Sequence, residues 1–374
     1  MKRLFALILV VAATAMAATT AAVAQQRWLG GDVSLLPSYE AQGTVYRDAA
    51  GLQVEPLPFF RQQGWNAIRV RLFVEPHLAP KQHQDEGVCQ DLPYVVRLGR
   101  RVHDAGMALM LDLHYSDYWA DPGKQAIPHL WRDTKRADLP DSVYQYTRRT
   151  LLQMKRQGVV PEMIQVGNEI TNGMLWPEGK IAWGKAGEAE SWAFLCRLLS
   201  AGCKACREVC PEARIIIHTE KAGQWNTTKK YYQQLRLHRV DYDVIGLSYY
   251  PMWHGTIATL GENLDRLQWL FPDKEVMIVE AAAYYSHDND RWAKPGQYSE
   301  FYPITVEGQT QFTRELVSEL NRHWNVRGLF WWFAEENACG NDLLPCWINR
   351  GLFDNHTGRV LPAMQELGKF RTER

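Results

Sequence analysis

The feature that most constrains the fold is an alternation of short apolar runs and longer helical segments, repeated eight times. The apolar runs of strand length are 29–34, 67–73, 108–114, 163–169, 214–219, 244–250, 276–280 and 328–333. Each run is almost continuously apolar, as is typical of parallel strands that are covered on both faces. Helical periodicity is found at 55–63, 93–105, 141–157, 188–209, 229–238, 260–269, 307–324 and 361–370.

Eight such units predict a single (β/α)8 barrel over residues 25–374. An open doubly wound sheet is the alternative, but the first run is not followed by the glycine-rich turn that a dinucleotide site needs. The longest connections follow the fourth, seventh and eighth runs, whereas the turns at 63–64 and 105–106 after helices are short. Because loops after strands share one end of a barrel, we expect an active-site cleft there.

The first 24 residues are expected to be a signal peptide. Lys2 and Arg3 precede an apolar run at 4–11, and residues 22–24 read Ala-Val-Ala, as in an A-x-A cleavage site. The run is short for a membrane span, and no later stretch is long enough for one. The sequence therefore predicts an exported protein, periplasmic or secreted, without a membrane span.

Composition excludes some partners. The 374 residues hold 42 basic and 42 acidic side chains, and no basic run is long enough to suggest nucleic acid. The chain has 15 Trp and 16 Tyr, and such rings suit the flat faces of sugars, although core filling is the ordinary role of any single Trp.

The seven cysteines fall into different settings. Cys339 and Cys346 lie in one loop and are the best candidates for a disulfide in an exported protein. Cys89 lies in another loop and is the odd one. Four share one predicted helix and are expected to face the core, with metal binding as a weaker alternative. These four are Cys196, Cys203, Cys206 and Cys210.

Polar and aromatic residues gather where the predicted strands end. They are Arg69, Arg71, Asp112, His114, Asn168, Glu169, His218, Tyr249, Tyr250, Glu280, Trp331 and Trp332. Glu169 and Glu280 end the fourth and seventh runs, so we expect them to face each other across the barrel mouth. Glycoside hydrolysis requires such a pair, because one carboxyl group protonates the leaving oxygen while the other attacks the anomeric carbon. A lone Glu at a strand end is more often an ion-pair partner or a loop cap.

The segment QVGNEITNGMLWP, residues 165–177, holds further candidates. The amide of Asn168 is placed to hydrogen-bond a sugar 2-hydroxyl group. Asn172 and Trp176 are candidates for the cleft wall. Aromatic side chains there would stack on sugar rings, at on the order of 1 kcal/mol each.

Four segments resemble family 53 of the glycoside hydrolases, the arabinogalactan endo-β-1,4-galactanases: GDVSLLP, LDLHYSDYWADPGKQ, QVGNEITNGMLWP and DVIGLSYYPMWHGT. The resemblance runs from Gly30 to about Pro362. It implies a retaining barrel of clan A that cleaves within β-1,4-galactan, the side chain of pectic type I arabinogalactan. It also implies that Glu169, in GNE, is the acid/base and that Glu280, in IVE, is the nucleophile.

The resemblance extends to residues that bind substrate. Arg71, His114, Tyr250 and Trp332 match positions around the cleaved bond, with Tyr249 as the alternative to Tyr250. The other substrate-binding candidates are Asp112, Asp117, Trp119, Asn168, Asn172, Trp176, His218 and Trp253. The sequence departs from the family pattern after His218, where Thr219-Glu220 stands in place of the usual Leu-Asp.

The expected partner is a polysaccharide, β-1,4-galactan, and the expected state is a monomer. The chemistry requires no cofactor. Some relatives hold a calcium ion in the loops after the seventh and eighth strands, where His287-Asp288-Asn289-Asp290 offers oxygen ligands and a disulfide between Cys339 and Cys346 is the alternative. Two other functions stay open: another retaining clan A glycanase, on mannan or arabinan, and a non-catalytic glycan-binding barrel. The retention of both glutamates argues against the second.

Overall fold

A computed structural model describes residues 26–288, 296–339 and 348–371. Its strands form one closed barrel in which each strand pairs in parallel with the next along the chain, and β8 pairs with β1. The strands are β1 (Trp28–Asp32), β2 (Ala67–Leu72), β3 (Ala108–Leu113), β4 (Met163–Val166), β5 (Arg214–Thr219), β6 (Val244–Tyr249), β7 (Glu275–Ala281) and β8 (Val326–Trp331). The predicted (β/α)8 barrel is confirmed, and the open sheet is excluded because the strands close on themselves.

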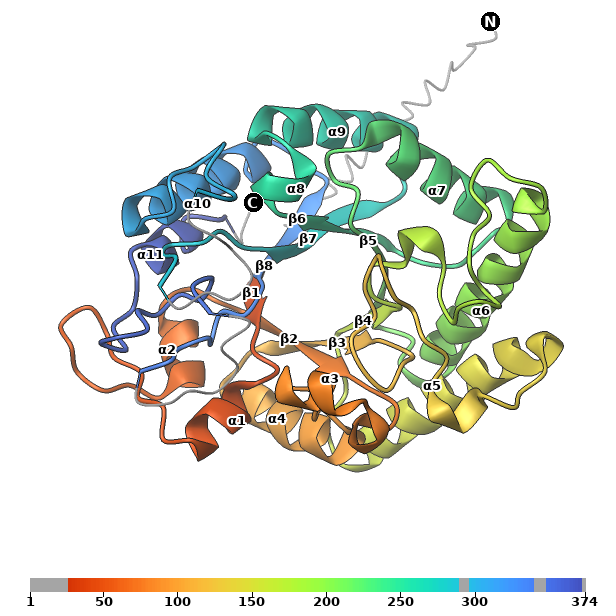
Figure 1. The fold of residues 1–374 in the computed structure, drawn as a ribbon, viewed down its shortest axis with the longest axis horizontal. Helices are drawn as coiled ribbons and strands as arrows, with labels where there is room; N and C mark the ends of the chain where they lie inside the picture. The colour runs from red at the N-terminus through yellow and green to blue at the C-terminus, as the bar shows by residue number, and fades with distance from the viewer. Residues whose placement is uncertain (1–25, 289–295, 340–347, 372–374) are drawn as a thin grey trace, which may run out of the picture.

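Helices surround the barrel as a ring (Figure 1). Those that correspond to predicted segments are α2 (Pro56–Gln62), α4 (Leu92–Asp104), α5 (Leu139–Arg156), α6 (Glu188–Val209), α7 (Trp225–Leu237), α9 (Ile257–Leu270), α10 (Val306–Leu320) and α11 (Ala363–Leu367). Short elements in the loops were not predicted: α1 (Leu36–Ala41), α3 (Lys81–Asp85), α8 (Pro251–His254), and the 3-10 turns η1 (Pro76–Leu78), η2 (His129–Trp131), η3 (Arg136–Asp138) and η4 (Ile170–Asn172).

The interior of the barrel is divided into an apolar and a polar layer. The apolar layer is a cluster of buried side chains from the seven strands β2 to β8: Ala67, Met110, Met163, Ile216, Val244, Met277, Val279 and Phe330. Side chains two residues apart share one face of a strand, so the next inward positions follow directly. They are buried and polar: Arg69, Asp112, Gln165 and His218. The polar layer forms the floor of the C-terminal end of the barrel.

Two strands depart from regular geometry next to the predicted catalytic residues. The run predicted at 163–169 leaves the sheet after Val166, because Gly167 has φ 87° and Glu169 has φ 47°, values that no strand can contain. Where β6 pairs with β7, Leu247 of β6 lies opposite Ile278 of β7, but the next residue of β6, Ser248, lies opposite Glu280. This irregularity skips Val279, so both Val279 and Glu280 reach the barrel interior.

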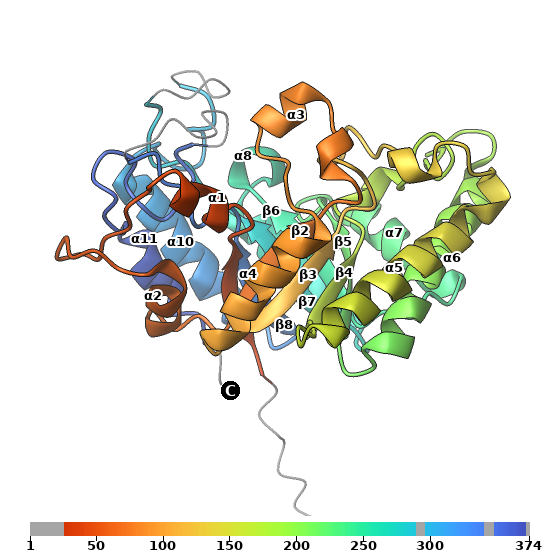
Figure 2. The same ribbon diagram turned by 90° about the horizontal axis from the view of Figure 1, so that it is seen from below.

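The loops that follow the strands gather at one end of the molecule. Figure 2 shows α3 and α8, which follow β2 and β6, at the same end. The connection between β2 and α4 is therefore a part of the active-site face that the sequence pattern did not single out. Among the described residues, no helix combines the length and the apolar character needed to cross a membrane.

Candidate active site

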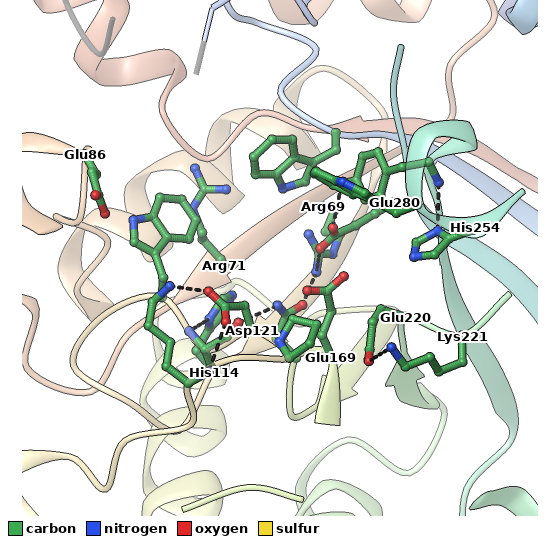
Figure 3. A pocket seen from close by; sticks show the side chains of 18 of the residues that line it. Arg69, Arg71, Glu86, His114, Asp121, Glu169, Glu220, Lys221, His254 and Glu280 are labelled. Atoms are coloured by element: carbon green, nitrogen blue, oxygen red, sulfur yellow. Dashed lines mark hydrogen bonds and ion pairs between the residues drawn. The ribbon is translucent and has the colours of Figure 1, made fainter. Parts of the chain in front are cut away.

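A cleft of about 630 Å³ opens at the C-terminal end of the barrel. Figure 3 shows the carboxyl groups of Glu169 and Glu280 pointing toward each other inside it. The lining also includes Arg69, Arg71, Gln82, His83, Glu86, His114, Trp119, Asp121, Lys124, Asn168, Glu220, Lys221, Tyr250, Trp253, His254, Trp332 and Arg350. The cleft thus holds two facing carboxyl groups within a wall of rings and hydrogen-bonding groups.

Glu169 lies just beyond β4 in a left-handed backbone conformation, with φ 47° and ψ 51°. A residue other than glycine pays about 1–2 kcal/mol for this conformation, a cost that is typical of functional sites. Ser248 donates a hydrogen bond of 2.6 Å to Glu169 Oε1. Burial raises the pKa of Glu169 well above its ordinary value, and the negative charges of Glu280 and then Glu220 raise it further. Glu169 is therefore suited to hold a proton.

Glu280 has the opposite surroundings. Arg69 Nη2 lies 2.9 Å from Glu280 Oε1, and the Tyr250 hydroxyl donates a 2.7 Å hydrogen bond to Oε2. Burial raises the pKa of Glu280, while the charge of Arg69 and the hydrogen bond from Tyr250 oppose that rise. Between these two carboxyl groups, Glu280 is the one whose ionised form is stabilised by a cation.

Arg69 ties the polar layer to the site. Its guanidinium contacts Asp32 Oδ2 at 2.9 Å and Asp112 Oδ2 at 2.8 Å, in addition to Glu280. Burial alone would raise the pKa of Asp112, but the charges of Arg69 and His114 lower this pKa to about 2. Buried charges that are paired in this way keep a fixed geometry, because separating them would leave uncompensated charge in the barrel.

Asn168 is held by the same network. Its Oδ1 accepts a 2.8 Å hydrogen bond from Arg69 Nη2, and its Nδ2 donates one of 2.8 Å to the carbonyl of Ala120. One N–H of the amide is left unused by the described residues. That group is available to a ligand in the cleft, as the predicted contact with a sugar hydroxyl requires.

Several of the predicted substrate-binding residues lie together in the cleft. They are Arg71, His114, Trp119, Asn168, Tyr250, Trp253 and Trp332. Asp112 and His218 are fully buried below them, where His218 Nε2 lies 2.8 Å from Ser248 Oγ. Their position suits them to orient residues that line the cleft.

Asp117 is not part of the cleft lining. Its carboxylate accepts hydrogen bonds from the backbone N–H groups of Glu75, at 3.0 Å, and His129, at 2.6 Å. Asp117 therefore links the loops that follow β2 and β3, and it stabilises the cleft wall without contacting the cleft itself. Asn172 and Trp176 line a separate groove beside the cleft.

The expectation that Tyr249 lines the cleft is wrong. Its side chain is fully buried on the outer face of β6, where it packs on Phe312 of α10 with ring centroids 6.2 Å apart. Trp331 packs on the same ring from β8, at 6.1 Å. Because side chains alternate along a strand, Tyr250 and Trp332 face the cleft instead.

Some residues of the cleft were missed by sequence reasoning. Gln82, His83 and Glu86 come from the loop that contains α3, whose short polar sequence carries no apolar period. Glu220 and Lys221 follow β5 and form an ion pair of 2.9 Å. The sequence offered one sign of this ion pair, which was the departure from the family pattern at Thr219-Glu220.

The cysteine and metal predictions have mixed outcomes. Cys196, Cys203, Cys206 and Cys210 are buried, as predicted for a stripe that faces the core. Cys346, Asn289 and Asp290 lie outside the described residues, so the predicted disulfide and most of the predicted calcium ligands do too. Within the described parts of the chain, no three or more His, Cys, Asp or Glu side chains are grouped so as to hold a metal ion.

Comparisons with known proteins agree with this geometry. The family model "Glycosyl hydrolase family 53" matches residues 28–367. A "Probable arabinogalactan endo-beta-1,4-galactanase A" of Aspergillus fumigatus is 30% identical over 338 residues, which cover 86% of this chain and 89% of that protein. An "Endo-beta-1,4-galactanase" of Bacillus subtilis is 32% identical over 312 residues, covering 81% of this chain and 68% of that protein.

A solved structure is similar over nearly the whole barrel. The "Ignisphaera aggregans GH53 catalytic domain" superposes with a TM-score of 0.80 at 28% identity, covering 92% of this chain and 96% of that one. The sequence match extends over most of the described chain and includes both glutamates. The chain therefore belongs to glycosyl hydrolase family 53.

Proposed function

We propose that the protein is a retaining endo-β-1,4-galactanase that acts on pectic type I arabinogalactan. The observation that carries the proposal is the unlike environment of the two facing carboxyl groups: Glu280 is paired with Arg69, whereas Glu169 is surrounded by negative charge. A double displacement needs this inequality, because one group must begin protonated and the other ionised. The names of the relatives support galactan as the substrate.

In the first step, Glu280 attacks the anomeric carbon with a carboxylate oxygen. The bond to the leaving sugar breaks, and Glu169 donates its proton to the departing oxygen. The product is a galactosyl ester of Glu280. We expect the two carboxyl groups to act at a separation of about 5–5.5 Å, the value typical of retaining enzymes.

In the second step, Glu169 acts as a base. Esterification removes the negative charge of Glu280, which lowers the pKa of Glu169. Glu169 then takes a proton from water while the water oxygen attacks the anomeric carbon and releases Glu280. The sugar keeps its β configuration after two inversions.

Rings in the cleft are suited to hold the sugar during both steps. Tyr250 packs edge-on against Trp253 and Trp332, at centroid distances of 5.3 and 6.2 Å. Such rings offer faces that bind sugar C–H groups, and Asn168 offers the second N–H of its amide as a hydrogen-bond donor. We further propose export through the N-terminal signal peptide, action as a monomer, and chemistry that uses no cofactor; a structural calcium ion stays a prediction.

The test is a panel of polysaccharides. Reducing ends should be released from β-1,4-galactan at least about a hundredfold faster than from β-mannan or arabinan, since a site built to bind one pattern of hydroxyl groups rejects others strongly. Glu280→Ala protein is the matched control for contaminating activity. Faster release of reducing ends from mannan or arabinan would contradict galactan as the substrate. If the wild-type protein bound galactan without cleaving it, the protein would be a glycan-binding barrel and not an enzyme.

A further inference from the structure

A second groove, of about 700 Å³, lies beside the cleft. It is lined by Pro122, Gly123, Asn172, Trp176, Lys180, Ile181, Ala182, Trp183 and Lys185. Pro122 lines both the groove and the cleft, and Asn172 donates a 3.1 Å hydrogen bond to its carbonyl. The groove and the cleft therefore adjoin at Pro122.

The groove lies on the side of Glu169, the proposed acid/base residue. Most of its wall comes from residues 172–185, the loop that begins directly after Glu169. The proton donor must touch the oxygen that leaves with the departing sugar. A chain bound across the active site therefore has its leaving-group end on the side of Glu169, and the groove is where that end would continue.

Two indole rings in the groove are fixed by the backbone that follows Glu169. Trp176 Nε1 donates to the carbonyl of Asn172 at 3.0 Å, and Trp183 Nε1 donates to the carbonyl of Thr171 at 3.2 Å. Both side chains are half-buried. Rings held in this way are preorganised platforms for sugar faces.

The groove has an excess of positive charge. Nearby carboxylates are paired with other cations: Asp121 with Lys124, Glu178 with Arg136 and Glu188 with Lys230. In the described parts of the chain, neither Lys180 nor Lys185 has a carboxylate within 4.0 Å. Lys180 Nζ instead lies 4.0 Å from the centre of the Trp176 ring, which holds the ammonium group at the groove wall.

We propose that this groove binds the leaving-group end of the polysaccharide and favours chains in which that end carries uronic acid sugars, whose carboxylates face Lys180 and Lys185. The proposal rests on the proposed galactanase activity and adds a preference for galactan that is still attached to an acidic backbone. The rings supply contacts that any sugar can use, and the two ammonium groups supply the discrimination.

The test compares two forms of one substrate. Galactan attached to a uronate-containing backbone is used either native or after chemical reduction of its carboxyl groups, which leaves chain length unchanged. Wild-type protein should show a kcat/KM about three- to tenfold higher on the native form at low ionic strength, and this preference should disappear in high salt. The double variant Lys180→Gln/Lys185→Gln should lose the preference and keep its rate on the reduced form. Lys229→Gln, on α7 and outside both linings, is the matched control and should behave as wild type.

A third variant separates the rings from the charges. Trp183→Ala should lower kcat/KM about fivefold on both polymers alike, since stacking does not depend on charge, and should leave short neutral galacto-oligosaccharides unaffected. Equal wild-type rates on native and reduced galactan, or a preference that survives in the double lysine variant, would overturn the inference alone. Failure to cleave either polymer would overturn the proposed function and the inference with it.

Discussion

Ser248 and Tyr250 lie on the same face of the polypeptide at the end of β6, and each holds one of the two glutamates. Ser248 donates a 2.6 Å hydrogen bond to Glu169, and Tyr250 donates one of 2.7 Å to Glu280. One strand end therefore positions both carboxyl groups relative to each other. Changes at these two positions should alter opposite limbs of the pH–rate profile.

Tyr250→Phe should lower kcat on galactan by about 10- to 100-fold, because it removes a donor that orients and stabilises the Glu280 carboxylate. The same hydrogen bond lowers the pKa of Glu280, so its loss raises that pKa and moves the acidic limb of kcat/KM to higher pH. The measurement is a pH–rate profile. Tyr249→Phe is the matched control, because the Tyr249 hydroxyl bonds the carbonyl of Gly255 away from the cleft. An equal loss in both variants would contradict the assignment.

Ser248→Ala should move the alkaline limb of the pH–rate profile to higher pH. The hydrogen bond from Ser248 favours ionised Glu169 and lowers its pKa, so removing the hydroxyl raises the pKa of the acid. Protonated Glu169 then persists to higher pH. An unchanged alkaline limb in a variant with near-normal kcat would show that Glu169 is not the group that titrates there.

Glu220→Gln should move the same limb in the opposite direction. The negative charge of Glu220 raises the pKa of Glu169, and glutamine removes that charge while it can still accept the 2.7 Å hydrogen bond from Thr171. The kcat/KM of the variant should begin to fall at lower pH than in the wild type. A merely structural role for Glu220 would instead lower the rate without displacing the limb.

His254 should make stability depend on pH. Burial, and then the charge of Lys221, lower the pKa of His254 from 6.5 to about 4 in the folded protein. The unfolded chain binds the proton first, so stability is lost as pH falls from about 6.5 toward 4. His254→Gln, whose side-chain oxygen can still accept the bond from the Tyr250 N–H, should show a smaller decrease of Tm over that range. Parallel Tm curves for the two proteins would show that His254 does not contribute.

The barrel could be predicted because the sequence pattern that produces it is local and is repeated in each strand–helix unit. Each strand is a continuous apolar run, and the apolar residues of each helix recur with helical periodicity. The order of these segments alone therefore indicates the topology. Boundaries were less predictable. The helix expected from Asp141 begins at Leu139, since Pro140 fits the first turn of a helix, and β4 ends early because Gly167 and Glu169 adopt left-handed conformations.

The catalytic pair could be predicted from strand ends, but its environment could not. That Glu280 faces the cleft depends on the skipped residue Val279, which leaves no mark in an apolar run. The choice between Tyr249 and Tyr250 was open to an alternation argument from Ser248, since residues two apart share a face. The wall formed by the α3 loop depends on tertiary contacts, such as the stacking of His83 on Tyr118 at 4.4 Å, that no period in the sequence reports.

The most direct test of the central claim is rescue of two alanine variants by azide during hydrolysis of β-1,4-galactan. Glu169→Ala should yield a β-galactosyl azide, because azide attacks the ester on Glu280 without needing a base. Glu280→Ala should yield the α-anomer, because azide takes the place of the missing nucleophile. Near-normal galactan hydrolysis by either variant, or the reverse pairing of anomers, would contradict the roles assigned to Glu169 and Glu280.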